Sequence, residues 1–414
     1  MTTATPVMSL AEVRRRFPAF ERQIVGKPVA YFDAPGGTQV PDTVADAVRD
    51  YLLHQNANTH WAFPTSAETD AMILRARQAA ADLLGASAGE VAFGANMTTL
   101  TFHVSRALGR QWGPGDEVLV TELDHHANVA PWQALARERG ITLRTAPLAA
   151  DMRSLDLDAF ARMLSPRTRL VAVGAASNAI GTITDPAVIT DMAHAVGALV
   201  FTDAVHFTPH DLVAVRAMGS DLLACSAYKF CGPHVGLLYV RKDLAEQLDV
   251  PKLEPAPDTA PERFETGTLN HEGIAGVEAA VDFLAELGGA EGSRRERLEA
   301  SYRWLHRQGE ALFQRMWEGL SAISGVHLYG HAPGGPRRTP TVAFTVGRMT
   351  SSAVASALAS EGVFVSDGDF YASTVVQRLG LAEQGLVRAG CACYTSEEEV
   401  ERLVEAVKEL KAEG

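Results

Sequence analysis

The sequence predicts an α/β protein whose mostly parallel sheet is covered by helices on both faces. Between residues 90 and 245, short β-rich runs alternate with helical stretches, the pattern of a parallel sheet. The apolar runs lack a clean in–out alternation, as expected for strands buried on both sides. A chain of 414 residues, 47% of them hydrophobic and 21% charged, can also bury a large core. At about 150 residues per domain, we expect a large domain with a smaller one attached.

The elements expected before residue 90 mix helices with turns. Arg14, Arg15 and Arg16 lie in the first helical pattern, and we expect them to form a solvated face. In order, the expected elements are a helical segment within 1–25, a strand end and Gly/Pro turn at 31–37, helices at 41–54 and 66–85, and a loop at 56–64.

Seven strands and four helices are expected in the alternating central part. The strands are predicted at 91–93, 117–121, 143–147, 170–174, 199–202, 222–225 and 236–240. The helices are predicted at 98–109, 128–139, 156–164 and 186–196. This part, with its flanks, predicts a large domain over 26–285.

The last third predicts a smaller α+β domain over 286–414, against which the segment 1–25 is expected to pack. A loop at 251–263 and a helical region at 273–320, broken at 288–292, lead into it. Its strands are predicted at 326–329, 342–346, 363–365 and 386–389, with helices at 350–361 and 397–411. The last helix is well marked, because Ser396 and Glu399 can form a capping box ahead of an apolar stripe.

Composition excludes several classes of function. With 37 Lys and Arg against 50 Asp and Glu, the net charge is −13, which argues against a nucleic-acid-binding protein. Four scattered cysteines form neither a disulfide framework nor a zinc pattern, so no metal is expected. No apolar run is long enough to span a bilayer, and no signal peptide is visible. We therefore expect a cytoplasmic enzyme with no membrane or nucleic-acid partner.

Polar residues follow the ends of consecutive predicted strands. They are Asp203, Lys229, Asn178 and the pair His125–His126. In open α/β sheets, ligands bind at the carboxyl ends of the strands. Each residue alone has a plain structural reading, as a turn cap, a surface lysine or a local hydrogen-bonding group. In this order on successive strands, they indicate one shared site.

A carboxylate, an amine, an amide and an imidazole at one site suit pyridoxal phosphate. This cofactor needs a lysine amine for a Schiff base and a carboxylate against its pyridine nitrogen. It also needs a flat partner for the ring face. Its phosphate favours hydroxyls and backbone N–H groups at a helix N-terminus, which residues 94–99 supply between a strand and a helix.

From about Tyr31 to the C-terminus, the sequence resembles the class V aminotransferases, and most closely the cysteine desulfurases. Six ordered segments carry the resemblance: 123–132 (LDHHANVAPW), 177–182 (SNAIGT), 202–206 (TDAVH), 226–233 (SAYKFCGP), 263–270 (RFETGTLN) and 387–390 (VRAG). The resemblance implies the type I fold of pyridoxal-phosphate-dependent transferases, with a seven-stranded sheet. It also implies an amino-acid substrate and a homodimer, because residues 263–270 serve the neighbouring active site in such enzymes.

The resemblance also implies roles for single residues. Around the cofactor ring, His125 stacks, Asp203 holds the pyridine nitrogen, Lys229 forms the Schiff base, and Asn178 and His206 face the ring hydroxyl. At the phosphate we expect Thr98, Ser226 and, from the partner subunit, Thr268, and Met97 and Tyr228 are further expected cofactor-binding residues. The expected substrate-binding residues are Arg388, which would pair with the carboxylate, Asn178, Gly36 and His60. For Gly36 and His60, a plain turn and a surface role are the respective alternatives.

One departure from the desulfurases concerns the nucleophile. They carry a cysteine on a mobile loop, and here residues 366–372 read SDGDFYA, with Tyr371 at that position. A phenol cannot accept a sulfur atom and pass it on. The cysteines at 225, 231, 391 and 393 are best explained as structural.

We therefore expect carbon–sulfur β-lyase chemistry rather than persulfide formation, with Tyr371 as a catalytic residue that protonates the departing thiolate. Transamination, racemisation or epimerisation remain alternatives for the reaction. A non-catalytic partner protein with this fold is an alternative from another class.

Overall fold

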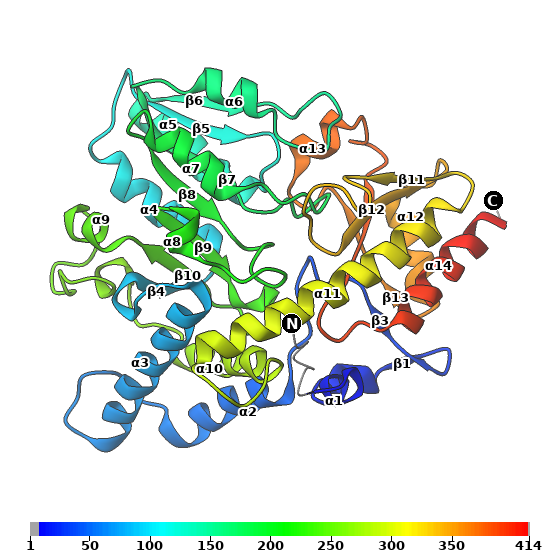
Figure 1. Cartoon of the computed structure of the whole chain (residues 1–414). Coiled ribbons are helices and arrows are strands. Elements are labelled where there is room, and N and C mark those ends of the chain that lie inside the picture. Colours follow the sequence, from blue (N-terminus) through cyan, green and yellow to red (C-terminus); the bar gives the residue numbers. More distant parts are fainter. Residues whose placement is uncertain (1–7, 413–414) are drawn as a thin grey trace.

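A seven-stranded sheet forms the centre of the larger part of the molecule, in the order β4-β10-β9-β8-β7-β5-β6 (Figure 1). The computed structural model describes residues 8–412. The strands are β4 (Val91–Gly94), β5 (Glu117–Thr121), β6 (Thr142–Ala146), β7 (Thr168–Gly174), β8 (Leu199–Asp203), β9 (Leu222–Ser226) and β10 (Gly236–Val240). The five strands from β9 to β6 pair in parallel, and β10 is antiparallel to both of its neighbours. The predicted mostly parallel sheet is confirmed.

Strand β7 shows why these strands lack an alternating polar pattern. Leu170 and Ala172 enter one apolar cluster, and Val171 and Val173 enter another on the opposite face of the sheet. All four side chains are buried. Since both faces are covered along the middle of the strand, the positions from Leu170 to Val173 are all apolar, whereas Arg169 near its start is exposed.

Helices cover both faces of the sheet, as the alternation predicted. Those between the strands are α4 (Met97–Gly109), α5 (Ala130–Arg139), α6 (Leu157–Met163) and α7 (Pro186–His194). A second group, α2 (Asp42–Asp50), α3 (Pro64–Leu84) and α10 (His271–Glu286), packs together below the sheet in Figure 1. The helix expected over 41–54 is α2 followed by a π-helical turn at Tyr51–Gln55, which leads into the loop at 56–63.

A four-stranded antiparallel sheet forms the core of the C-terminal part, in the order β11-β12-β15-β14. Its strands are β11 (Val326–Tyr329), β12 (Thr341–Val346), β14 (Ser366–Gly368) and β15 (Leu386–Gly390). Its helices are α12 (Ser351–Ser360), α13 (Ser373–Arg378) and α14 (Glu397–Ala412), and the long helix α11 (Arg294–Ser321) leads into it from α10. Strand β14 and helix α13 were not among the predicted elements.

The strand expected at 363–365 lies outside this sheet. It is β13 (Val363–Phe364), and it pairs in parallel with β3 (Ala30–Tyr31) near the start of the chain. The N-terminal residues therefore contact the C-terminal part directly. The domain boundaries at 25/26 and 285/286 stay predictions, and residues 1–7 lie outside the described residues.

Short elements complete the chain. The helices are α1 (Leu10–Arg15), α8 (Val215–Met218) and α9 (Lys242–Gln247), and β1 (Gln23–Ile24) pairs with β2 (Lys27–Pro28). Turns of 3-10 helix occur at Pro18–Glu21, Ala88–Glu90, His126–Asn128, Ala227–Lys229 and Glu262–Phe264. Within residues 8–412, no helix combines the length and the apolar character needed to cross a membrane.

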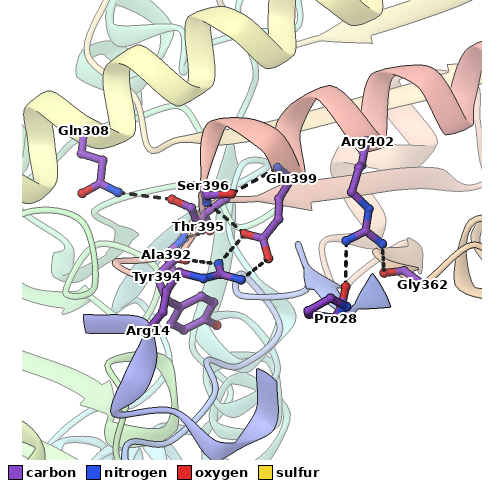
Figure 2. A network of polar contacts seen from close by, with 10 residues as sticks. All are labelled: Arg14, Pro28, Gln308, Gly362, Ala392, Tyr394, Thr395, Ser396, Glu399 and Arg402. Atoms are coloured by element: carbon purple, nitrogen blue, oxygen red, sulfur yellow. Dashed lines mark hydrogen bonds and ion pairs between the residues drawn. The ribbon is translucent and has the colours of Figure 1, made fainter. Parts of the chain in front are cut away.

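Helix α1 is fastened to the start of α14 by an ion pair (Figure 2). The Arg14 guanidinium donates to both carboxylate oxygens of Glu399, at 2.8 and 2.9 Å, and to the Tyr394 carbonyl oxygen at 2.7 Å. Glu399 also accepts from the Ser396 backbone N–H at 2.9 Å, which closes the predicted capping box. The expectation of a solvated arginine face is wrong for Arg14, and also for Arg16, which pairs with Asp42 and Glu286.

Candidate active site

A cavity of about 600 Å³ lies where β5, β7, β8 and β9 end. Strand β10 is antiparallel, so it begins at the same edge and brings His234 there. Nine of the predicted site residues line this cavity: Met97, Thr98, His125, Asn178, Asp203, His206, Ser226, Tyr228 and Lys229. Those from His125 to Lys229 end or follow four different strands, and they meet because the strands end at the same edge of the sheet. The rule that ligands bind at this edge predicted that they would lie together.

Asp203 is the last residue of β8 and is buried. Its Oδ1 accepts a hydrogen bond from the Val205 backbone N–H at 2.9 Å. Burial raises the pKa of Asp203 to about 6, against the opposing effects of the Val205 N–H and the charge of Lys229. The carboxylate is therefore mainly ionised at neutral pH, as a partner for a protonated ring nitrogen must be.

Lys229 lies in the turn Ala227–Lys229, directly after β9. Its Nζ donates hydrogen bonds to the carbonyl oxygens of Pro35, at 2.5 Å, and Gly36, at 2.9 Å. Burial, helped by the charge of Arg388, lowers the pKa of Lys229 to about 7, although Asp203 and Asp33 oppose this. A large share of the amine is therefore neutral near pH 7, and a neutral amine can act as nucleophile or base.

The ring of His125 is held in one tautomer. Its Nδ1 accepts a hydrogen bond from the Ala127 backbone N–H at 3.0 Å, so the ring proton lies on Nε2. Burial, with the charges of Lys229 and Arg388, lowers the pKa of His125 to about 4. The imidazole is therefore neutral at physiological pH, which suits a flat stacking partner.

The start of α4 forms the end of the cavity predicted to bind phosphate. Asn96 caps the helix by accepting from the Thr99 N–H at 2.9 Å, and the Ser226 hydroxyl accepts from the Met97 N–H at 3.0 Å. Gly236 lets this loop approach β10 closely, because a Cβ there would lie 2.6 Å from the Asn96 carbonyl carbon. Thr98 is exposed to the cavity. A helix N-terminus with nearby hydroxyls is a favourable phosphate site.

Two buried polar atoms in the lining have no hydrogen-bond partner, Asn178 Oδ1 and His206 Nδ1. The other nitrogen of His206, Nε2, lies 3.0 Å from the Thr339 hydroxyl. Buried polar atoms are normally paired, so these two indicate a polar ligand in the cavity. With the amine, the carboxylate, the flat imidazole and the helix N-terminus, the residues present fit pyridoxal phosphate.

Arg388 lies on β15, beside the cavity, and is joined to it through Asn178. Its Nη1 donates to the Asn178 carbonyl oxygen at 2.7 Å, and its Nη2 lies 3.4 Å from the Ser366 hydroxyl. Burial lowers the pKa of Arg388 to about 9, so the guanidinium stays charged at neutral pH. Gly36 lies next to it, since a Cβ at residue 36 would be 3.6 Å from Nη2.

Tyr371 lies beside His125, with 5.6 Å between the ring centroids. Its side chain is 73% exposed, and its carbonyl oxygen accepts from the His126 N–H at 2.7 Å. The structure thus brings Tyr371, which the resemblance predicts at the cysteine position, next to the predicted stacking ring. The roles of all these residues remain predictions.

The structure does not bring His60 and Thr268 into this cavity. The His60 side chain is exposed, with its Nδ1 3.2 Å from the Asp70 carboxylate. Thr268 is also exposed and lines a separate pocket, which shares only Ala95 and Thr99 with the cofactor cavity. A contribution of Thr268 to a neighbouring subunit stays a prediction.

Two buried carboxyl groups at the site were missed by the sequence analysis. Asp33 has a buried oxygen without a partner, and burial raises its pKa to about 6 against the charges of Arg388 and Lys229. Asp124 accepts from the Thr121 and Gly174 N–H groups, and burial, with the charge of Asp203, raises its pKa to about 7. Asp124 follows β5 of the parallel sheet, so the strand-end rule that found Asp203 could have found it, whereas Asp33 follows β3, which lies outside that sheet.

Comparisons with known proteins agree with this geometry. The family model for class-V aminotransferases matches residues 30–403. A cysteine desulfurase from Klebsiella pneumoniae is 33% identical over 419 residues, covering 97% of this chain and 98% of that protein. One from Synechococcus elongatus is also 33% identical and covers 97% of this chain, which spans only 63% of that longer relative.

The fold agrees as well. The apo structure of a cysteine desulfurase from Thermococcus onnurineus NA1 matches with a TM-score of 0.87 and 28% identity over all of both chains. The family resemblance and the fold type expected from the sequence are confirmed.

Proposed function

Since this chain belongs to the class-V aminotransferase family, which is pyridoxal-phosphate-dependent, we propose that it is a carbon–sulfur β-lyase that acts on an α-amino acid. Family membership supports an enzyme rather than the non-catalytic partner protein left open by the sequence. A β-lyase differs from a desulfurase in that it forms no persulfide on the protein.

Different residues of the cavity are expected to bind different parts of the cofactor. When bound, pyridoxal phosphate supplies an electron sink that stabilises negative charge at the substrate α-carbon. Asp203 would hold the proton on the ring nitrogen, and His125 would cover one ring face. The unpaired atoms of Asn178 and His206 would bind the ring hydroxyl. The phosphate is assigned to Thr98 and Ser226, with Thr268 of the partner subunit, and Met97 and Tyr228 are further expected contacts of the cofactor.

Three side chains act on the substrate. Arg388 binds the α-carboxylate through two N–H groups, which fixes the α-carbon in place. The Lys229 Nζ, with a pKa lowered to about 7 by burial, removes the α-proton as a general base. The Tyr371 hydroxyl then gives its proton to the sulfur that leaves the β-carbon.

The observation that carries the proposal is the residue beside His125, which is Tyr371 and not a thiol. A persulfide carrier must present an accessible thiolate. All four cysteines are buried, and burial raises the pKa of Cys225 to about 12 and that of Cys391 further. Sulfur is therefore expected to leave as a small molecule and not as a protein persulfide.

A homodimer is part of the proposal. The segment 52–63 exposes Leu52, Leu53, Trp61 and Phe63, and exposed apolar clusters commonly mark association surfaces. Four unpaired thiols suit a reducing compartment, which supports a cytoplasmic location.

The test is a product analysis of the purified holoenzyme with L-cysteine, its thioethers and a panel of other amino acids. A β-lyase turns L-cysteine and water into pyruvate, ammonia and sulfide, with no persulfide on the protein. Alanine with a protein persulfide would overturn the proposal in favour of a desulfurase. A keto acid with transferred nitrogen would indicate transamination, and a D-isomer would indicate racemisation. Lys229→Ala is the matched control and should give none of these products.

A further inference from the structure

The segment at the desulfurase cysteine position has an unusual backbone. Phe370 and Tyr371 both have positive φ, 56° and 57°, although neither is a glycine. Two consecutive bulky residues in the left-handed region are unfavourable, because Cβ crowds the following carbonyl oxygen. Such a conformation persists only where the surroundings hold it.

Four hydrogen bonds hold this segment in place. The Asn178 side chain donates from Nδ2 to the Phe370 carbonyl oxygen at 2.9 Å, and the His126 N–H donates to that of Tyr371 at 2.7 Å. Within the segment, Asp369 accepts from the Tyr371 N–H at its side chain and from the Ala372 N–H at its carbonyl oxygen. The segment is therefore docked against residues that follow β5 and β7.

Docking places the Phe370 ring against the guanidinium of Arg388, with 4.1 Å between Cζ and the ring centroid. A guanidinium over an aromatic face is attracted by the ring quadrupole, and more strongly when desolvated. Arg388 is 3% exposed, so this contact is dry.

The hydrogen-bonding edges of Arg388 are used unequally. Nη1 is occupied by the Asn178 carbonyl oxygen, whereas Nε is buried without a partner and Nη2 has only a long contact to Ser366. The Nε–Nη2 edge is thus the free fork for a bidentate carboxylate. Gly36 faces this edge without a side chain.

We propose that Phe370 is a positioning residue for carboxylate recognition. Its ring holds the Arg388 guanidinium flat, so that the Nε–Nη2 edge stays available to the substrate. Asn178 ties the two together, since its carbonyl oxygen binds Arg388 and its side chain binds the Phe370 backbone. This inference rests on the proposed function, and nothing in the sequence pattern assigned a role to Phe370.

The test compares two amines on the holoenzyme, glycine and methylamine, which differ by one carboxylate. Binding is followed through the visible absorbance of the cofactor. Phe370→Ala should weaken glycine binding about 30-fold, the value of a desolvated cation–π contact, and leave methylamine binding within twofold. Phe370→Tyr, which keeps the ring, should bind glycine like the wild type, and Phe370→Leu should behave like the alanine variant.

The Arg388→Lys variant shows whether Phe370 acts by positioning the Arg388 guanidinium or only by packing in the interior. In that background, Phe370→Ala should change glycine binding no further, because the guanidinium it positions is gone. The inference is overturned if Phe370→Ala and Phe370→Leu bind glycine as tightly as the wild type, or if both amines weaken equally. If the wild-type protein shows no spectral response to either amine, the proposed function fails instead. Thermal unfolding of each variant identifies any that fail to fold.

Discussion

The Lys229 amine donates a hydrogen bond of 2.5 Å to the backbone carbonyl oxygen of Pro35, and a second one to that of Gly36. The turn at residues 33–37 therefore holds the amine from one side through two carbonyl oxygens. Carbonyl oxygens can accept from the amine whether it is charged or neutral. Burial can thus lower the pKa of Lys229 to about 7 without leaving the amine unpaired.

This pKa predicts the pH dependence of cofactor attachment. Only the neutral amine attacks an aldehyde, so the attachment rate of the cofactor-free protein should rise with pH and level off above about 7. An ordinary lysine would continue to rise toward pH ~10.4. The visible absorbance after mixing with pyridoxal phosphate at each pH measures the rate. Asp33→Asn should lower the midpoint, because the Asp33 charge favours the protonated amine. A midpoint near pH 10 in the wild type would contradict this picture.

Asp203→Asn should reduce turnover by about 10²-fold or more, since it removes the charge that keeps the ring nitrogen protonated. Cofactor attachment should survive, because Lys229 and the phosphate end are unchanged. Steady-state kinetics and absorbance measure the two effects separately. Asp203→Glu, which keeps the charge, should retain more activity than the asparagine variant, and equal losses would argue against the electrostatic role.

Tyr371→Phe should slow elimination by about 10²-fold for poor leaving groups, because it removes the proton donor but keeps the ring beside His125. Leaving thiols of low pKa need no protonation and should be affected least. The measurement is kcat for a series of cysteine thioethers of increasing thiol pKa. Full turnover across the whole series would remove Tyr371 from the mechanism.

Arg77→Ala should destabilise the protein by about 3–5 kcal/mol, because it leaves the buried Glu265 carboxylate without its partner. The two side chains, each 6% exposed, are joined by contacts of 2.7 and 3.2 Å, and Glu265 also accepts from the Phe93 N–H. Chemical unfolding gives the difference. The control is Arg75→Ala, because Arg75 is exposed and its pair with the partly buried Glu278 should be worth less than about 1 kcal/mol. Equal losses in the two variants would contradict the assignment.

Arg14→Ala should cost about 2 kcal/mol, since Glu399 is largely buried and Arg14 supplies both of its charged contacts. Arg15 is the matched control on the same helix: it is exposed, so Arg15→Ala should change the unfolding midpoint little. Unfolding midpoints in urea would distinguish the two. If both arginines were solvated as their sequence pattern suggested, the two variants would be equally stable.

Sequence reasoning located much of the lining of the strand-end cavity for a physical reason. Parallel strands end at one edge, so polar residues after successive strands, such as Asp203 and Lys229, must come together. Arg388 came only from the family resemblance, because no periodicity tells where a strand of the smaller sheet meets the larger one. Pairing between residues 385 positions apart, as for Arg14 and Glu399, leaves no local signal at all.

The loop next to the site contains elements that could not be predicted from the sequence. Residues 366–378 contain β14 and α13, which are three and six residues long. Segments this short show too few periods of an apolar pattern to be recognised. The left-handed backbone at Phe370 and Tyr371 could not be predicted either, because a glycine is the usual sequence signal for a positive φ and neither residue is a glycine.

The attachment of α1 to α14 bears on how this protein can be shortened. A chain trimmed to the range that matches the family, 30–403, would lose Arg14 and the buried Phe17 ring, which packs against Tyr394. It would also lose β1, β2 and the second half of α14. Such a fragment would keep every residue lining the cofactor cavity and still expose a charged carboxylate and an apolar surface. The range recognisable by homology is therefore smaller than the range that must be expressed for stable folding.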